Sequence, residues 1–574
     1  MMTELCCSSS RPFRRAALPK PAFLRACAGI FAAVWVTACG GGTPAAVSTA
    51  PPPVPPPVST APPDTEVLAF SNQSFASGLS FSAGFSEDYT DMPRHFAGGA
   101  AAGDIDNDGD IDVLVLRGNT QPNLLFQNDG GVFTNIADGL IANPNGGTAN
   151  YKLSGPSFSD MDGDGHLDIF MGGMDGDPSL IFKGAGDGTF EDVSTSAGLG
   201  TMTSRNTVSA AFGDYDQDGD MDLALAHWGT PRSRLSPGET ETLWRNQSQN
   251  GTIMFEPVSE AAAISAELAL TSNGALGPDH DYTFSPNFAD INDDGWPDLL
   301  SVADFAGSRV FINNQDGTFS NVTDTTQIID SNGMGSAVGD YDNDGDVDWF
   351  VSSIDGNRLY ENMDGTLINV TDFAGIAFGG WGWGSCFADF NLDGHLDIYQ
   401  TNGWIENGGA NPAEPFTRDR SRLWIADGDK RFTDEAGAIR IDDETQGRGV
   451  ICADFDGDND TDILLLISDA DQGAIYWRND SAAAHSVTLT FDGPPPNTAA
   501  IGTRVFITIG DIEQMREISA GSNFTSQNPP SQIIGMGEAD IIDRIRVQWP
   551  DGTRTQMTDI TAGQRLNISH PAAQ

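Results

Sequence analysis

The stretch Asp340-Tyr341-Asp342-Asn343-Asp344-Gly345-Asp346-Val347-Asp348 decides how the rest of the chain is interpreted. Side-chain oxygens stand at positions 1, 3, 5 and 9 of this nine-residue loop, and position 7 can offer its backbone carbonyl. Glycine at position 6 permits a sharp turn. Ca²⁺ takes roughly six to eight oxygen ligands and accepts irregular geometry. The stretch therefore predicts a calcium-binding loop.

The same pattern occurs seven times, and we number the copies loops 1 to 7 in chain order. Loops 4 and 6 carry Asn at position 3, which is still an oxygen donor, and loop 7 carries Asn459 at position 6, a residue type that tolerates positive φ. The predicted metal ligands, including the position-7 residues that bind through their backbone, are Asp104, Asp106, Asp108, Asp110, Asp112; Asp160, Asp162, Asp164, His166, Asp168; Asp214, Asp216, Asp218, Asp220, Asp222; Asp290, Asn292, Asp294, Trp296, Asp298; Asp340, Asp342, Asp344, Asp346, Asp348; Asp389, Asn391, Asp393, His395, Asp397; and Asp454, Asp456, Asp458, Asp460, Asp462.

Two other interpretations of the loops were weighed. An EF-hand needs a Glu at position 12 and a helix on each side, but position 12 is never Glu here and the flanking segments are typical of strands. The loops could also be polar Asp-Gly hairpins without metal. Oxygen donors at positions 1, 3, 5 and 9 in seven copies favour metal sites.

Charge supports this interpretation. The chain of 574 residues has 81 acidic and 29 basic residues, a formal net charge of −52, and 31 of the acids lie in the 63 loop positions. Metal sites explain such concentration better than general surface acidity does. The charge also argues against nucleic-acid binding, because phosphate contacts need clustered Lys and Arg.

The segments around each loop predict a small antiparallel sheet of about four strands. The seventh repeat lacks its last strand, whereas residues 70–79, before the first repeat, match the pattern of residues 190–199. Pairing this N-terminal segment with the seventh repeat would remove an open sheet edge. We therefore predict an all-β fold, a seven-bladed β-propeller over residues 66–480 that is closed by an N-terminal strand.

The loops resemble those of FG-GAP or VCBS repeats. This resemblance implies about seven structural Ca²⁺ ions. After residue 480 the loops do not return, and Ile501-Gly502, Ser526-Gln527-Asn528 and Trp549-Pro550 stand in a segment that resembles the ASPIC/UnbV domain over residues 485–571. We expect a small β-rich domain there. Four arginines, Arg504, Arg516, Arg544 and Arg546, would favour its docking on the acidic propeller.

The N-terminus predicts export. A basic region precedes an apolar run over residues 26–38 that is too short to span a bilayer. Val36-Thr37-Ala38-Cys39-Gly40 resembles a bacterial lipobox, which makes residues 1–38 a lipoprotein-type signal peptide and Cys39 the lipidation site; an ordinary signal peptide is the alternative. Gly40 favours the outer membrane. Residues 39–65 form a Pro/Gly-rich linker, so membrane contact would be through the lipid anchor alone.

Two further cysteines, Cys386 and Cys452, lie three and two residues before loops 6 and 7. This parity difference predicts opposite strand faces, and hence two buried free thiols rather than a disulfide. The Trp381–Cys386 stretch could stack on a sugar or pack around inner strands. No spacing of His227 or His280 indicates Zn²⁺.

The sequence predicts a calcium-binding exported protein, at the outer membrane or cell surface of a bacterium, whose propeller binds a protein or glycan. Residues 230–241 and 401–420 are longer than hairpin turns require and are the predicted partner surface. A polysaccharide-active enzyme is the alternative. No pair of carboxylates identifies a catalytic site, so no catalytic residue is assigned.

Overall fold

The computed structural model describes residues 68–84, 96–147, 150–233, 235–269, 279–354, 356–405, 416–468, 472–481 and 485–573. The predicted signal peptide, Cys39 and the linker lie outside these residues. None of the described helices has the length and apolar character needed to cross a membrane.

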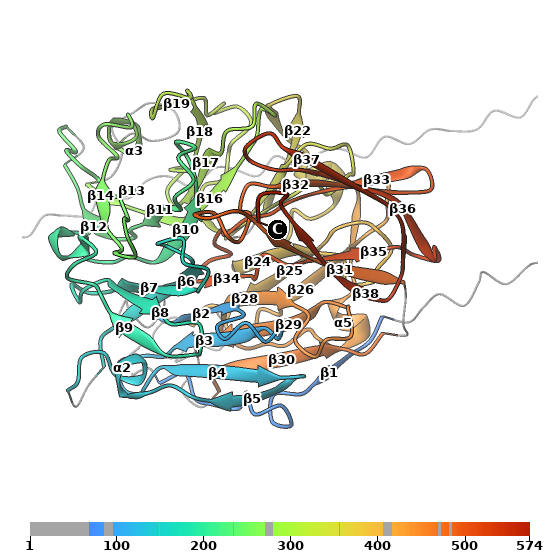
Figure 1. Cartoon of the computed structure of the whole chain (residues 1–574), viewed down its shortest axis with the longest axis horizontal. Helices are drawn as coiled ribbons and strands as arrows, with labels where there is room; N and C mark the ends of the chain where they lie inside the picture. Colours follow the sequence, from blue (N-terminus) through green and yellow to red (C-terminus); the bar gives the residue numbers. More distant parts are fainter. Residues whose placement is uncertain are drawn as a thin grey trace, which may run out of the picture. The chain divides into compact units, whose positions relative to one another are not determined.

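Each loop joins the first two strands of a different antiparallel sheet (Figure 1). The innermost strands are β2 (Gly99–Gly103), β6 (Leu153–Ser159), β10 (Ser209–Gly213), β16 (Thr283–Ala289), β20 (Gly333–Gly339), β24 (Gly382–Ala388) and β28 (Gly447–Ala453). The second strands are β3 (Asp112–Leu116), β7 (Asp168–Gly173), β11 (Asp222–Ala226), β17 (Asp298–Ala303), β21 (Asp348–Ser353), β25 (Asp397–Asn402) and β29 (Asp462–Ile467).

The third strands are β4 (Leu124–Asp129), β8 (Leu180–Gly184), β13 (Leu243–Asn246), β18 (Arg309–Asn313), β22 (Arg358–Met363), β26 (Arg422–Ala426) and β30 (Ala474–Asn479). The outer strands are β5 (Val132–Asn135), β9 (Phe190–Asp192), β14 (Phe255–Pro257), β19 (Phe319–Asn321), β23 (Thr366–Asn369), β27 (Phe432–Asp434) and β1 (Phe70–Asn72). Short elements connect them: β12 (Thr230–Pro231), β15 (His280–Asp281), α2 (Gly139–Ala142), α3 (Ser265–Leu268), α4 (Thr371–Ala374), α5 (Ala436–Ile439) and the 3₁₀ turn η1 (Leu199–Thr201).

The sheets form a closed ring. Each innermost strand packs against the next along the chain, and β28 packs against β2. The outer edge of the last sheet is completed by β1, in which Phe70 pairs with Asn479 and Asn72 with Trp477. The prediction of an all-β propeller closed by an N-terminal strand is therefore confirmed.

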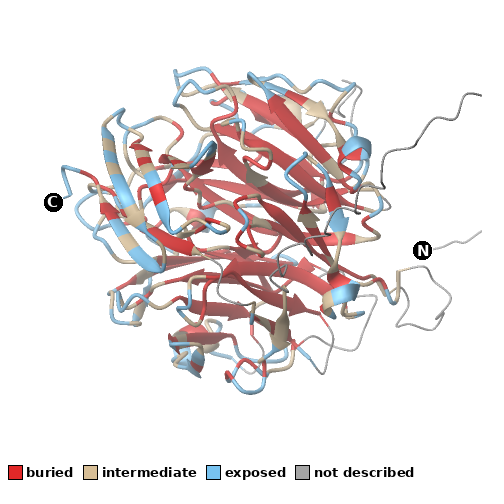
Figure 2. Ribbon diagram, turned by 90° about the vertical axis from the view of Figure 1, so that its right-hand side faces the viewer, coloured by how far each residue is buried: buried red, intermediate tan, exposed pale blue. Residues whose placement is uncertain are grey.

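Apolar faces between neighbouring sheets hold the ring together. Most of the strands in the ring are buried (Figure 2). Second strands are buried along their whole length, as in β21 and β29. Their Val, Ile and Leu residues do not alternate with polar ones, because both faces of each sheet are covered by neighbours. Between the sheets of loops 4 and 5, for example, Trp349 and Tyr360 pack with Leu300 and Val302.

The C-terminal residues form two further sheets. One contains β35 (Gln532–Gly535), β31 (Ser486–Asp492) and β38 (Gln564–Ser569), and the other contains β33 (Ile512–Glu517), β32 (Arg504–Ile509), β36 (Ile541–Gln548) and β37 (Arg554–Thr561). This agrees with the small β-rich domain expected from the sequence.

One segment of this domain enters the propeller. Strand β34 (Ser526–Gln527) pairs in parallel with β2 and also contacts β6 and β28 (Figure 1). The surrounding residues, 519–528, bond to the innermost strands of several sheets: Phe158 N donates to Gln527 Oε1 (2.7 Å), Phe212 N to Ala520 O (3.0 Å), Asn287 Nδ2 to Ser522 O (3.1 Å), Ser385 N to Asn523 O (3.3 Å) and Val450 N to Ser526 Oγ (2.9 Å). We call residues 519–528 the axial plug.

The prediction of two free thiols is wrong. Cys386 on β24 and Cys452 on β28 form a disulfide, with Cα atoms 6.7 Å apart. Within a single sheet, residues of opposite parity point to opposite faces and stay apart. In a ring of stacked sheets one face of each sheet meets the opposite face of the next, so residues of opposite parity on neighbouring innermost strands approach each other.

Candidate metal loops and the domain that covers them

Backbone N–H groups fold each loop around the position-1 carboxylate. In loop 5 Asp340 accepts bonds from Asp344 N and Gly345 N, both 3.1 Å, and Asp344 accepts one from Asp346 N at 3.1 Å. Positions 4 and 6 adopt left-handed backbone conformations, with φ of 58° at Asn343 and 97° at Gly345. Positions 1 to 7 therefore wrap into a compact turn.

The position-9 carboxylate holds the loop to its sheet. Asp348 is fully buried, accepts Tyr341 N through Oδ2 (3.0 Å) and Asn362 N through Oδ1 (2.7 Å), and so connects position 2 to the third strand. The same two bonds recur at the other position-9 residues, Asp112, Asp168, Asp222, Asp298, Asp397 and Asp462. Position 9 thus has a structural role that the ligand pattern did not reveal.

In five of the loops, three carboxylates bring one oxygen each to within 4.8 Å of one another. Positions 1, 3 and 5 converge in loops 1, 3 and 5, and positions 1, 3 and 9 converge in loops 2 and 7. Loops 4 and 6, where Asn occupies position 3, show no cluster of three acids among the described residues. The predicted position-7 side chains do not join these clusters; Asp110 and Asp346, for instance, accept bonds from Gly130 N and Asp364 N.

The clusters have the donor set that a hard cation requires. At position 3 of loops 1, 2, 3 and 7, a buried carboxylate oxygen has no hydrogen-bond partner among the described residues: Asp106 Oδ1, Asp162 Oδ1, Asp216 Oδ1 and Asp456 Oδ1. A buried carboxylate oxygen without a partner costs free energy, and Ca²⁺ prefers such oxygens. The residues present therefore fit Ca²⁺.

Burial of the loop carboxylates also destabilises the folded chain when no metal is bound, because it disfavours their ionised form. It raises the pKa of Asp340 and Asp389, both at position 1, to about 7. At position 9 it raises the pKa of Asp168 to about 8 and that of Asp348 well above its ordinary value. Neighbouring carboxylates of the same loop raise these pKa values further, and a bound divalent cation would oppose both effects.

Residues outside the loops form ion pairs or hydrogen bonds with the loop carboxylates. The loop pattern did not predict these residues. A third-strand residue one or two places before the end of the strand faces position 3: Lys183 Nζ contacts Asp162 and lies 3.0 Å from Asp164, and Gln127 Nε2 donates to Asp106. In loop 5 this residue is Glu361, and Lys430 Nζ of the next sheet lies 2.5 Å from Asp342 and 2.8 Å from Glu361. Where position 3 is Asn, the facing residue is Ile312 or Ile425.

A second missed set links neighbouring sheets. Asn362 Nδ2 on β22 donates to Val347 O of its own sheet (3.2 Å) and to Ile291 O of the previous sheet (2.8 Å). Asn128 Nδ2 likewise donates to Phe455 O (2.8 Å), across the junction that closes the ring. The equivalent residues are Asn246, Asn313 and Asn479, whereas Gly184 and Ala426 stand there in the sheets of loops 2 and 6. The recurrence of Asn at this point was a signal that the sequence offered.

The C-terminal domain covers the loop side of the propeller. Thr498 Oγ1 donates to Asp160 Oδ2 at 2.6 Å, and Arg565 Nη1 lies 3.6 Å from Asp454 Oδ2. Arg504 pairs with Asp293 and donates to Asp290 O at 3.0 Å. The expectation that arginines favour docking thus holds for Arg504.

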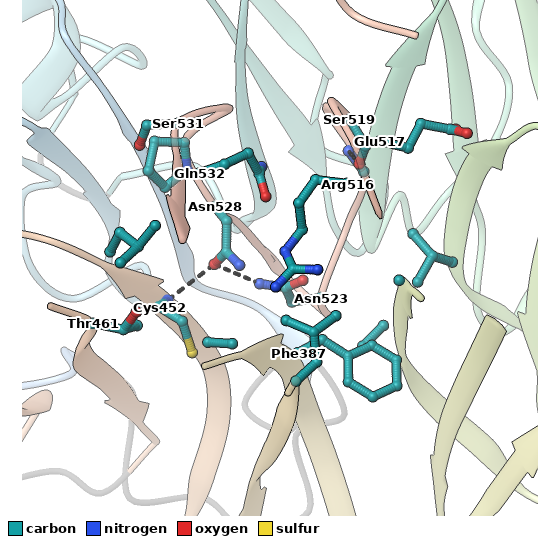
Figure 3. A pocket seen from close by; sticks show the side chains of 18 of the residues that line it. Phe387, Cys452, Thr461, Arg516, Glu517, Ser519, Asn523, Asn528, Ser531 and Gln532 are labelled. Carbon is teal, nitrogen blue, oxygen red and sulfur yellow. Dashed lines mark hydrogen bonds between the residues drawn. The ribbon is translucent and has the colours of Figure 1, made fainter. Parts of the chain in front are cut away.

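The other predicted docking arginines divide into two groups. Arg516 is buried at the interface, where the attraction of Asp389 and Asp340 opposes the burial that lowers its pKa. It projects into a cavity of about 130 Å³ beside Asn523 and Asn528 (Figure 3). The prediction is wrong for Arg544 and Arg546, whose side chains pair with Glu513 inside the domain.

The remaining candidates serve packing in this structure. His227 is fully buried between Thr207 and the Glu241 backbone carbonyl. Trp383 is buried and contacts Trp381 and Trp404, whose rings stack at 4.6 Å between centroids. The two predicted partner segments begin at the ends of β11 and β25 that point away from the loops, and residues 406–415 of the second lie outside the described residues.

The closed ring of sheets, each with one acidic hairpin, defines a repeat β-propeller. Residues 104–171, 160–225, 290–351 and 340–399 match the model of the FG-GAP-like repeat, and residues 493–574 match that of ASPIC and UnbV. The chain therefore combines FG-GAP-like repeats with a C-terminal ASPIC and UnbV domain.

The chain is also similar to particular named proteins. Cartilage acidic protein 1 of Mus musculus is 24% identical over 492 residues, covering 81% of this chain and 72% of that protein, and that of Xenopus tropicalis is 25% identical over 505 residues with the same shares. Among solved structures, an Agrocybe aegerita lectin that recognises non-reducing terminal N-acetylglucosamine has a TM-score of 0.38 at 17% identity, covering 59% of this chain and 79% of the lectin chain. The Dos1 propeller has a TM-score of 0.36 at 11% identity, covering 81% and 99%.

Proposed function

We propose that this chain is a calcium-binding, exported surface protein whose propeller is a scaffold for binding a protein or glycan. The observation that carries the calcium assignment is the set of position-3 carboxylate oxygens, buried without a hydrogen-bond partner among the described residues, beside the position-1 carboxylates. Oxygen-only donor sets of this kind suit Ca²⁺ better than softer metals.

The ions would have a structural role. Their binding to the folded chain alone adds to its free energy of unfolding. Extracellular-type sites have dissociation constants on the order of 10⁻⁴–10⁻³ M, which suits a compartment with abundant calcium. Counting bound calcium by elemental analysis after dialysis tests this role; a chain that retains no calcium at millimolar free concentration contradicts it.

Export is supported by the Cys386–Cys452 disulfide, because such bonds persist in oxidising compartments. The proposal places the mature chain at the bacterial outer membrane or cell surface, held by a lipid on Cys39. Mass spectrometry of the mature N-terminus tests the anchor. A mature chain that begins elsewhere, or an unmodified Cys39, would rule the lipid out.

The C-terminal domain covers the loop side, so the proposed partner surface is at the opposite ends of β11 and β25, from which the chain continues towards residues 230–241 and 401–420. Pull-down from envelope extracts with calcium and with chelator tests ligand binding. A polysaccharide-degradation assay run in parallel tests the enzyme alternative: soluble product lost on substitution of an acid outside the loops would replace the scaffold proposal.

A further inference from the structure

A second cavity lies between loops 3 and 4 and the C-terminal domain. Its volume is about 330 Å³, within the range of roughly 300–1,000 Å³ found for small-molecule sites. The propeller contributes Gln217, Trp296 and Pro297, and the C-terminal domain contributes Gln548, Trp549 and Pro550. Each body therefore supplies a proline and a side-chain amide, and the partly exposed aromatic ring comes from Trp296, since Trp549 is buried in the core of its domain.

The side chain of Trp296 has no role in the loop, although its backbone N–H donates to Asp294 Oδ1 at 2.9 Å. It occupies position 7, where the predicted metal contact is the backbone carbonyl and where the other loops carry Asp or His. Its side chain is half-buried and belongs to none of the buried core clusters of the described residues. The indole ring of Trp296 instead lines the cavity.

The polar groups of the cavity have spare bonding capacity. Within the described residues, the Gln548 side chain and the Trp296 indole N–H make no hydrogen bond. Gln217 Nε2 donates to Gly295 O at 2.5 Å, which fixes the amide and leaves its oxygen to accept another bond. A ligand with several hydroxyl groups would satisfy these donors and acceptors.

The charge of the lining selects against anions. Asp294, Glu517 and Asp551 line the cavity, and its one arginine, Arg504, is already paired with Asp293 and Glu517. Phosphate, sulfate and carboxylate ligands need unpaired cationic donors. A neutral ligand with hydroxyls on its edge and an apolar face remains, and that is the chemistry of a neutral sugar ring.

We propose that this interdomain cavity binds a neutral sugar residue of a glycan, which stacks on Trp296 and bonds to the Gln217 and Gln548 amides. This inference rests on the proposed scaffold function and adds a glycan site on the loop side, separate from the partner surface proposed at the opposite ends of β11 and β25.

The test uses the exported chain with the C-terminal domain, loaded with calcium. A printed array of neutral and acidic glycans identifies binders, and isothermal titration with the methyl glycoside of the best terminal sugar measures affinity. Trp296→Ala and Gln548→Ala should each weaken binding at least about tenfold, equal to about 1.4 kcal/mol. Phe305→Ala, an exposed aromatic outside the cavity, should change it less than about twofold.

Calcium-dependent melting of each variant separates a folding defect from a binding defect. Trp296→Ala should keep the calcium response, since the backbone of position 7 is unchanged. Binding that survives Trp296→Ala, or that is lost with Phe305→Ala instead, would move the site elsewhere. An array without any neutral binder would overturn the sugar proposal, while calcium-dependent capture of an envelope protein would leave the scaffold function standing.

Discussion

Two adjacent sheets, those of loop 5 and loop 6, are joined to their neighbouring sheets by different kinds of bond. Loop 5 carries five carboxylates, three of them clustered, and its third strand is joined to the previous sheet by Asn362. Loop 6 carries three carboxylates and Asn391, its third strand ends in Ala426, and its innermost strand is joined to the next sheet by the Cys386–Cys452 disulfide.

The difference shows that charge and neighbours change together. Asp342 faces Glu361 and Lys430, whereas Asn391 lies in a sheet whose corresponding third-strand residue is Ile425. A loop with fewer carboxylates has less negative charge for a bound cation to compensate. Its sheet therefore depends more on the disulfide and on apolar contacts. We therefore expect the local stability of the two sheets to change by different amounts when calcium is removed, when the pH changes or when the disulfide is reduced.

Chelation should have the largest effect. Removing calcium leaves carboxylates uncompensated in every loop, and we expect the melting temperature to fall by about 10 °C or more. Hydrogen exchange should rise more in β20 and β21, which flank loop 5, than in β24 and β25, which flank loop 6. An unchanged melting curve in EDTA would refute structural calcium, and equal exchange in both sheets would refute the difference between them.

Removing calcium should make stability depend on pH between about 5 and 8. Burial raises the pKa of Asp340 from 3.8 to about 7, so the folded chain without metal binds protons that the unfolded chain does not bind between those values. In chelator, the penalty is complete above about pH 7, and stability should increase as the pH falls from about 8 to about 5.

With excess calcium the bound carboxylates are deprotonated in the folded chain, as they are in the unfolded chain, so stability should change little over the same fall in pH and decrease only near the unfolded pKa of 3.8. Thermal melts at both ends of the range, with and without chelator, check the two slopes. Parallel slopes in the two conditions would show that the raised pKa values do not report on the metal sites.

Breaking the disulfide should affect the sheet of loop 6 more than that of loop 5. The bond closes a loop with a sequence separation of 66, for which chain entropy gives a stabilisation of about 4 kcal/mol. Cys386→Ser with Cys452→Ser should lower the free energy of unfolding by up to that amount and speed exchange in β24 and β28. Faster exchange in β20 instead would show that the covalent bond does not act locally.

Much of this architecture was predictable because its signals are local. The loop spacing and the four-strand pattern lie within single repeats, and the segment around Phe70 could be matched to the missing last strand of the seventh repeat; together they predicted the propeller and its closing strand. The disulfide was not predictable from strand parity, because the stacking of sheets decides which faces meet.

The charge partners of the loops lay beyond any local pattern. Lys430 reaches Glu361 from 69 residues away, and Phe158 meets Gln527 of the axial plug across 369 residues. Only the folded ring brings such residues together. The order of domains along the chain predicted neither the plug nor the covering of the loops.

Asn362→Ala should have the smallest of these effects while testing the comparison most directly. It removes two buried donors and leaves Ile291 O and Val347 O without them, which costs about 2–3 kcal/mol in the free energy of unfolding. Asn314→Ala, at an exposed site of the neighbouring sheet, is the matched control and should cost less than about 0.5 kcal/mol. Because Ala426 already occupies the equivalent point next to loop 6, a loss no greater than the control's would mean that the sheets of loops 5 and 6 are held alike.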